Sequence, residues 1–330
     1  MNRLKSLKII GGGVASLFLL LLPVLLPEVD VNLATEILIF ALFAVSFNLL
    51  LGYCGLLPFG HAACFGVGAY ATALIFKHIT GMPFLITIMI SALSGFVGAL
   101  IIGFFCVRLS GAYFALISLA FQMFFYAVAL KWRDVTGGDD GMSVPRPDLY
   151  LPGLGTLSLM NIQYLYYITL VIVVLAILAC YLFLKTPLGH AAISMRENAT
   201  RASFLGFNVF LTRLAVFCFS GFLAGIAGAL FVVHQEFVAT TVMDVHMSFT
   251  VMLMATIGGT GHFLGPVLGA VFFMVFQDWI SSLTKHWWLF MGIFFVMVVL
   301  YAEGGLSGCL NGERSVPGSQ ARRSHEGWPF

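Results

Sequence analysis

The strongest constraint on this chain is a series of long apolar runs that contain no charged residue. Residues 164–184 read YLYYITLVIVVLAILACYLFL, and residues 84–107 also lack Asp, Glu, Lys and Arg. A helix needs about 20 mostly apolar residues to cross a bilayer, and only helices and closed barrels satisfy every backbone hydrogen bond in lipid. Barrel strands would give short segments of alternating polarity, so these continuous runs indicate membrane-spanning helices.

The composition agrees with a protein whose solvent is the lipid bilayer. Of the 330 residues, 60% are hydrophobic and 9% are charged, whereas an ordinary soluble domain has about 25% charged residues. The chain is therefore predicted to be all-α and polytopic, with about ten spans. Their approximate ranges are 9–27, 33–51, 56–76, 84–107, 111–130, 164–184, 211–233, 247–261, 264–282 and 288–301.

The first apolar run has two possible interpretations. It follows three basic residues, as the apolar region of a signal peptide does. Pro27, Glu28 and Asp30 stand where a small-residue cleavage site would be expected. We therefore expect this run to be retained as a span.

The basic residues predict which side of the membrane each loop faces, because cytoplasmic loops carry an excess of Lys and Arg. With the N-terminus inside, eleven of the sixteen basic residues fall on the cytoplasmic side, namely Arg3, Lys5, Lys8, Arg108, Lys185, Arg196, Arg201, Arg213, Arg314, Arg322 and Arg323. The other five are Lys77, Lys131, Arg133, Arg146 and Lys285. We expect both termini in the cytoplasm, and residues 186–209 to form the largest structured cytoplasmic loop.

That loop is predicted to contain a helix from about 187 to 206. Thr186 suits the N-cap, Pro187 the first helical position and Gly206 the stop. The polar face includes Glu197 and Arg201, which are four residues apart and so can pair. One narrow face carries mostly small residues, at Leu188, Ala192, Met195, Ala199, Ala202 and Gly206. A helix lying at the lipid headgroups would present bulky apolar residues, so the small face favours docking against a protein partner.

Polar residues inside the spans are the candidates for a translocation path, because such residues are costly in lipid and usually face a cavity or another helix. Asn48, His61 and Gln122 stand out. The alternative for each is a hydrogen bond between helices. Glu36 and Asp278 lie near the outer ends of their spans, and no carboxylate lies near the middle of one, so an ion-coupled mechanism is disfavoured.

No motif for catalysis or for nucleotide binding is found. The nearest approach to a phosphate loop, residues 55–60, is followed by His61 and lies in an apolar run. The six cysteines show no CxxC spacing, which argues against a zinc site or a disulfide framework. We expect no enzyme activity, no cofactor, no bound metal and no nucleic-acid partner. Any ATP hydrolysis must take place on another polypeptide.

The outer loops offer weak candidates for a metal site. Asp139 and Asp140 lie in the loop of about 131–163, where adjacent carboxylates are usually solvated. His234, Glu236, Asp244 and His246 lie in the next outer loop. Nothing in their spacing fixes a coordination geometry, so we do not expect a metal there.

Five sequence motifs, in order along the chain, resemble the permeases of branched-chain amino acid importers of the ATP-binding-cassette (ABC) type. They are GLLPFGHAACFGVGAY at 55–70, LSGAYFALISLAF at 109–121, TGGDDGM at 136–142, PLGHAAISMRENATRASFLGFN at 187–208 and IGGTGHFLGPVLGA at 257–270. The resemblance extends from about residue 36 to 308. It departs from the family at Thr200 and Arg201, and at residues 303–306. It implies a permease domain at 1–308, followed by a cytoplasmic tail at 309–330 whose composition is typical of disorder.

The resemblance also implies a function and a set of partners. The chain would be a permease subunit in a bacterial inner membrane, carrying branched-chain or related apolar amino acids. Its partners would be a second permease subunit, two cytoplasmic ATPase subunits and a periplasmic substrate-binding protein docked on the 131–163 side. The motif at 187–208 would be the coupling helix that contacts the ATPase, through Leu188, Gly189, Ala192, Arg196, Glu197, Asn198, Ala199, Ala202 and Gly206. The alternatives are a permease for urea or short amides and, from another class, a self-sufficient secondary transporter or channel.

Overall fold

The computed structural model describes residues 20–23, 27–79, 81–151 and 155–301. This part of the chain is almost entirely helical. The helices are α2 (Glu28–Asn48), η1 (Leu49–Cys54), α3 (Ala62–His78), α4 (Phe84–Cys106), α5 (Ala112–Lys131), α6 (Arg133–Thr136), α7 (Ile162–Leu184), α8 (Pro187–Phe204), α9 (Val209–Gln235), η2 (Thr240–Met243), α10 (Val245–Gly258), α11 (Gly265–Leu283) and α12 (Trp287–Tyr301). The strands are β1 (Met142–Ser143), β2 (Asp148–Leu151), β3 (Gly155–Ser158) and β4 (Phe237–Val238).

The predicted all-α class is confirmed, and every predicted span from residue 33 onward overlaps a helix. Six segments of the described chain are long and apolar enough to cross a membrane: Glu28–Cys54, α4, α5, α7, α9 and α11. The full count of about ten spans stays a prediction. The predicted first span falls largely outside the described residues, and the tail at 309–330 falls wholly outside them.

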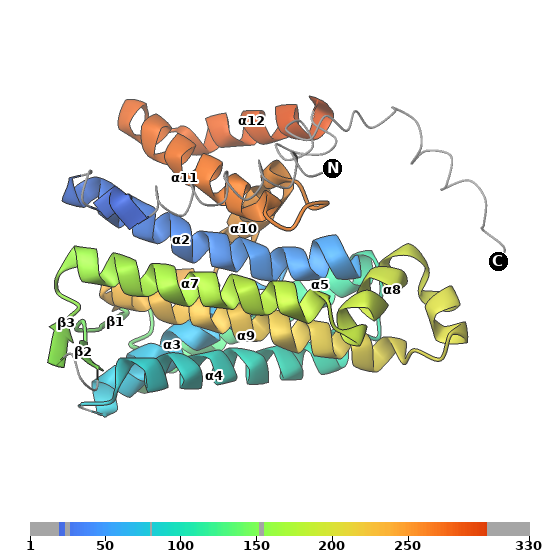
Figure 1. Ribbon diagram of the computed structural model, residues 1–330, viewed down its shortest axis with the longest axis horizontal. Coiled ribbons are helices and arrows are strands. Elements are labelled where there is room, and N and C mark those ends of the chain that lie inside the picture. The colour runs from blue at the N-terminus through green and yellow to red at the C-terminus, as the bar shows by residue number, and fades with distance from the viewer. Residues whose placement is uncertain (1–19, 24–26, 80, 152–154, 302–330) are drawn as a thin grey trace, which may run out of the picture.

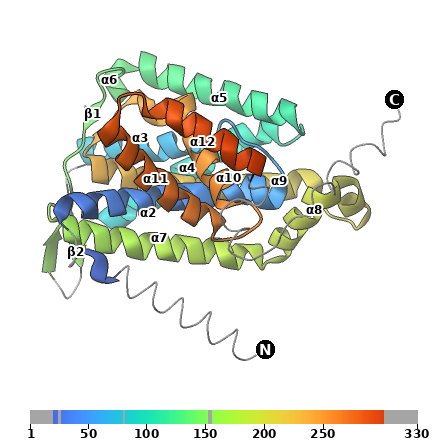
Figure 2. The same ribbon diagram turned by 90° about the horizontal axis from the view of Figure 1, so that it is seen from above.

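The long helices pack side by side around α9. Figure 1 shows α2, α7, α9 and α4 running along the longest axis of the molecule. Helix α9 packs against α4, α3 and α2, and its membrane-spanning part is mostly buried within the chain. Figure 2 shows α5 along one side of this group and α7 along the other.

Glycines allow α9 to approach α4 and α3 closely. A Cβ placed on Gly225 would lie 2.7 Å from the carbonyl oxygen of Ser91 on α4. A Cβ on Gly221 would lie 2.8 Å from the carbonyl oxygen of Gly95, also on α4. Small residues at such positions let helices meet closely in a membrane, and these two glycines have that role between α9 and α4.

Polar caps set where several helices begin. The side chains of Asn161, Thr186, Asn208 and Asp244 each accept a hydrogen bond from a backbone N–H in the first turn that follows. Such caps satisfy N–H groups that have no partner within the helix. Two of them, Asn161 and Asn208, begin the membrane-spanning helices α7 and α9.

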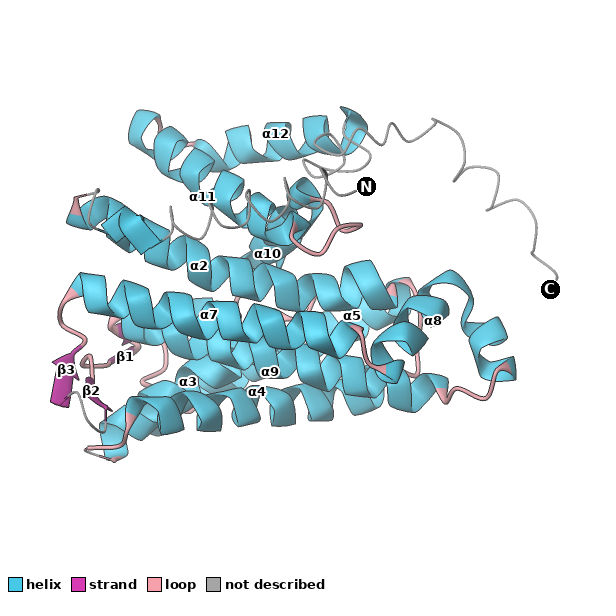
Figure 3. Cartoon of the chain, viewed as in Figure 1, coloured by secondary structure: helices cyan, strands magenta, loops and turns pink. Residues whose placement is uncertain are grey.

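The molecule has two distinct polar ends. Figure 3 shows the strands β1, β2 and β3 at one end of the long axis and α8 at the other. β1 pairs antiparallel with β4, and β2 pairs antiparallel with β3. The loop at 131–163 therefore contains α6 and three short strands and is not one helix. It lies at the opposite end of the molecule from α8.

Candidate functional site

Helix α8 begins and ends as its sequence predicts. The Thr186 hydroxyl accepts a hydrogen bond from the Gly189 N–H at 3.3 Å, and Pro187 takes the first helical position. At the other end Gly206 adopts φ +88°, a left-handed conformation that favours glycine after a helix. The N–H of Phe207 then reaches back to the Ala202 carbonyl at 3.3 Å.

The middle of α8 differs from the prediction of one straight helix. Asn198 has φ −158° and ψ 102°, which breaks the helix into two segments, and the Asn198 side chain caps the second segment by accepting from the Arg201 N–H at 2.9 Å. The predicted pair of Glu197 and Arg201 does not form an ion pair, because the kink lies between them and removes the i,i+4 register. Figure 1 shows the resulting bend.

The small side chains of α8 face the chain itself. Ala192, Met195 and Ala202 are each at most 3% exposed, and Gly189 packs against the backbone of Leu184. Helix α8 packs on α7, α9 and η1. These small side chains let α8 lie close to its own bundle. Leu188 and Gly206 of the same face are exposed, so docking of this face against a partner stays a prediction.

Bulky apolar side chains of the same region point outward instead. Phe204 is 85% exposed and Leu205 is 75% exposed, and Leu188 and Phe207 are also exposed. Glu197 and Arg201 are exposed beside them, and Ala199 is half-buried. The sequence prediction included Leu188 and Glu197 of these residues. It left the phenylalanines unassigned, because it gave weight to the small side chains.

Arg196 joins α8 to the first membrane-spanning segment that the structure describes. Its Nη1 donates a hydrogen bond to the carbonyl oxygen of Gly52, inside the π-helical turn η1. The carbonyls of a last helical turn have no partner within the helix. The carbonyl oxygen of Leu50 accepts a hydrogen bond from the N–H of Leu56 at 3.0 Å. The carbonyl oxygen of Gly52 accepts its hydrogen bond from Arg196. Gly55, with φ +71°, ends the turn against the Arg196 side chain.

The geometry of this turn suits a point of mechanical contact. A π-helical turn within an α-helical span often occurs at a functional site. A single guanidinium connects this turn to α8. The sequence signal for this contact is the motif LGYCG at 51–55. Its two glycines lack side chains, so the Arg196 side chain can approach the backbone of this turn closely.

The three predicted path residues lie deep inside the chain. His61 and Gln122 are fully buried and Asn48 is 2% exposed. The Nε2 atom of His61 lies 2.9 Å from the hydroxyl of Ser46, and the His61 ring stacks on Phe43 with centroids 5.4 Å apart.

Gln122 is held at both ends of its amide. It donates to the carbonyl of Met243 at 3.1 Å and accepts from the Ser248 hydroxyl at 2.7 Å. Ser248 in turn accepts from the N–H of Ala62, the residue after His61. These bonds tie α5, η2, α10 and the start of α3 together. A role in the path stays a prediction for Asn48, His61 and Gln122, since the contacts seen are between elements of the fold.

The amide oxygen of Asn48 is buried without a hydrogen-bond partner among the described residues, and so is the Nδ1 atom of His61. A Cβ on Gly52 would lie 2.9 Å from the Asn48 Cγ, so the orphaned oxygen sits beside the π-helical turn. A buried acceptor left unpaired is destabilising by about 1–3 kcal/mol. Asn48 is thus a predicted path residue that lies beside the turn contacted by Arg196 and has an unpaired acceptor.

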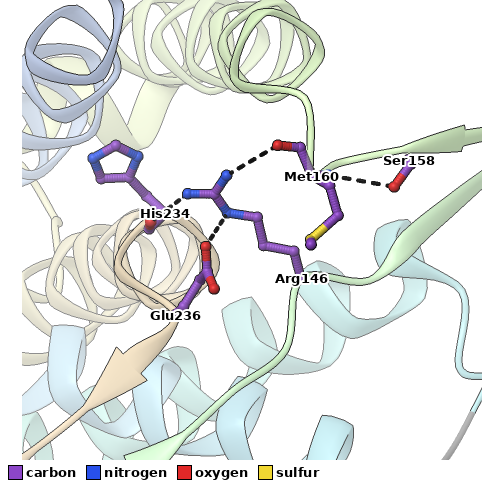
Figure 4. Close-up of polar contacts among 5 residues, drawn as sticks. All are labelled: Arg146, Ser158, Met160, His234 and Glu236. Carbon is purple, nitrogen blue, oxygen red and sulfur yellow. Dashed lines mark hydrogen bonds and ion pairs between the residues drawn. The ribbon is translucent and has the colours of Figure 1, made fainter. Parts of the chain in front are cut away.

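Arg146 anchors the outer loop to the end of α9. Figure 4 shows its guanidinium between the Glu236 carboxylate and the backbone carbonyls of His234 and Met160. The Nε atom lies 2.9 Å from the Glu236 carboxylate, and the two carbonyl contacts are 3.2 and 3.5 Å. Glu236 has φ +57°, an uncommon conformation for a residue with a side chain.

This arrangement lies at the predicted outer end of the molecule, and we call it the outer cap, defined as residues 131–151 and 155–160 with β4. Strand β1 pairs with β4 directly after Glu236. Asp139, Asp140 and Trp132 are exposed on the cap. Among the described residues no group of three His, Cys, Asp or Glu side chains is placed to hold a metal ion. The cap is held by its own contacts and presents mixed charge and an aromatic side chain outward.

An almost wholly helical chain with six apolar segments long enough to cross a bilayer defines a polytopic membrane protein. The sequence model of the branched-chain amino acid transport system permease component family matches residues 30–302. The chain belongs to this family. The predicted resemblance is confirmed. The members of this family are transport permeases.

Individual relatives agree with this placement. The chain is 27% identical over 319 residues to the high-affinity branched-chain amino acid transport system permease protein LivM of Salmonella typhimurium, covering 91% of this chain and 75% of that protein. It is 23% identical over 274 residues to a probable LivM of Methanocaldococcus jannaschii, covering 72% and 77%.

A shorter match is to a protein whose name gives a different substrate. A nucleoside ABC transporter permease protein, NupC of Lactococcus lactis, is 33% identical over 108 residues, 32% of this chain and 33% of that protein. No solved structure matches the chain significantly.

Proposed function

We propose that this chain is the membrane-spanning permease subunit of an ABC importer for branched-chain or related apolar amino acids. The observation that carries the proposal is the family match, which covers nearly all of the described chain. In this proposal the chain sits in a bacterial inner membrane with both termini in the cytoplasm. It pairs with a second permease subunit and takes substrate from a binding protein docked on the outer cap.

Helix α8 is the proposed contact for a separate ATPase. Its exposed face carries Phe204 and Leu205, with Glu197 and Arg201 beside them. A bulky apolar face rimmed by charge is typical of the centre of a protein interface. Bulky side chains of this kind also suit the lipid headgroup region. The Arg196 bond to Gly52 supports the ATPase alternative, because a helix that transmits force needs a fixed link to the bundle.

The substrate class is proposed as apolar amino acids because the relatives covering most of this chain carry that name. A permease for urea or short amides is the alternative within this type of importer. A nucleoside cargo is favoured only by the shorter match. A self-sufficient secondary transporter or channel is the alternative from another class.

The experiment is competition uptake. The chain is co-purified with its neighbouring subunits, reconstituted in vesicles and supplied with ATP and radiolabelled leucine. We expect unlabelled isoleucine and valine to compete, and urea, acetamide and adenosine not to compete. Competition by urea or adenosine but not by valine would overturn the proposed substrate class.

A further inference from the structure

A cavity opens at the outer end of the bundle, on the side of α10, α11 and α12. Its volume is about 420 Å³, within the range of roughly 300–1,000 Å³ that is usual for small-molecule sites. Residues from α2, α9, η2, α10, α11 and α12 line it. Thr241, His246 and Trp288 on its wall are exposed, so the cavity communicates with the outer surface. We call it the outer acidic cavity.

The cavity carries negative charge that no basic side chain neutralises. Glu36 and Asp244 line it, and no Lys or Arg does. Asp278 is near enough to Glu36 for their charges to interact. One Asp244 oxygen caps α10 by accepting from the Val245 N–H at 2.6 Å. Glu36 has no hydrogen bond or ion pair with any described residue, and a carboxylate at that depth in a span is costly unless it has a partner.

The remaining wall is apolar and rich in aromatic rings. Phe40 and Phe231 come from α2 and α9, and Trp288 comes from α12. Met247 and Met274 fill the wall between them. An ammonium group is attracted to aromatic faces as well as to carboxylates, and methionines adapt to branched apolar groups. The wall therefore suits a ligand with one cationic group and one apolar group.

We propose that the outer acidic cavity binds the α-ammonium group of an apolar amino acid, with Glu36 as the counter-ion. The aromatic rings and methionines receive the apolar side chain. The Gln277 amide and the Thr250 hydroxyl, both on the wall, supply donors for the α-carboxylate. The inference rests on the proposed function, since it names where on the outer side the substrate of that transporter is first held by the permease.

The test measures protection of a cysteine introduced at the cavity mouth. Thr241→Cys is placed in the full transporter together with Cys309→Ser, because the other five cysteines are buried. An impermeant maleimide labels Thr241→Cys from outside, and leucine is added as the protecting ligand. We expect leucine and isopentylamine to slow the labelling. Isocaproate, which lacks the ammonium group, and KCl should not slow it.

Glu36→Gln should raise the half-protecting concentration of leucine about tenfold, because it removes the charged acceptor of the hydrogen bond from the leucine ammonium group. Glu36→Asp, which keeps the charge, should retain most of the protection and shows that the site still folds. Glu28→Gln is the matched control, because Glu28 is exposed at the start of the same helix. It should leave protection unchanged.

Three results would overturn the inference. They are equal protection in Glu36→Gln and the parent, equal protection by isocaproate, and protection by KCl, which would indicate an inorganic cation site only. Uptake is measured on the same vesicles. ATP-driven leucine uptake without protection would reject the cavity and leave the proposed function intact. Protection without ATP-driven uptake would reject the proposed function and leave the cavity as an ammonium site.

Discussion

The contact between Arg196 and the Gly52 carbonyl gives the most specific prediction. Arg196→Ala removes the only side-chain donor that reaches Gly52 from α8 among the described residues. A hydrogen bond from a charged donor contributes about 1.5–3 kcal/mol, and leaving the acceptor unpaired is destabilising by about 1–3 kcal/mol. Arg196 is partly solvated, so we take the lower end, about 1.5 kcal/mol. That value corresponds to roughly a tenfold change in an equilibrium constant.

The expected effect is on coupling and not on assembly. Arg196→Ala leaves the exposed apolar side chains of α8 in place, so the ATPase should still co-purify and hydrolyse ATP. The bond between α8 and η1 is lost, so the amount of leucine transported per ATP hydrolysed should fall about tenfold. Arg196→Lys keeps the charge on a flexible stem without the planar fork, and it should give an intermediate loss.

The assay measures ATP hydrolysis and radiolabelled uptake in the same proteoliposomes. His190→Ala is the matched control, because His190 is exposed on the same helix, outside the proposed ATPase contact, and its ring has no hydrogen bond or ion pair with any described residue. The control should keep the parental ratio. If Arg196→Ala and His190→Ala gave the same ratio of transport to hydrolysis, the Arg196 contact would not transmit the motion of α8.

Three further changes test other parts of the structure. Gly225→Ala places a Cβ 2.7 Å from a carbonyl oxygen of α4 and should destabilise the bundle by about 1–3 kcal/mol, measured by thermal unfolding in detergent; Gly292→Ala, where a Cβ meets nothing, should not. Arg146→Ala should expose residues 131–160 to limited proteolysis. Glu236→Gly should have a smaller effect on that proteolysis, because glycine tolerates the positive φ and so offsets the lost ion pair. Phe204→Asp should reduce retention of the ATPase in pull-down without changing thermal stability, and unchanged retention would favour the lipid headgroups as the contact of α8.

Local patterns in the sequence predicted the helical elements well. Long apolar runs such as 164–184 can be satisfied in lipid only by helices, so α7 followed from composition alone. The ends of α8 followed from Thr186, Pro187 and Gly206, because caps depend on neighbouring residues.

The features that failed or were missed depend on contacts far apart in the sequence. The small stripe of α8 could not be assigned to a face without knowing that η1 and α9 lie beneath it. The kink at Asn198 follows from a side-chain cap that competes with the helix. The Arg196 contact with Gly52 joins residues 144 positions apart. The outer acidic cavity gathers residues from six elements, and no periodicity connects them.

In the proposed function, transport by this chain is powered by a separate ATPase. Vesicles are prepared with the permease subunits alone and with the permease and ATPase subunits together, each with the binding protein and leucine. We predict uptake only in the second set of vesicles. It should require hydrolysable ATP on the side of the membrane where α8 lies. Leucine uptake by the permease subunits alone, driven by a proton or sodium gradient, would contradict the account.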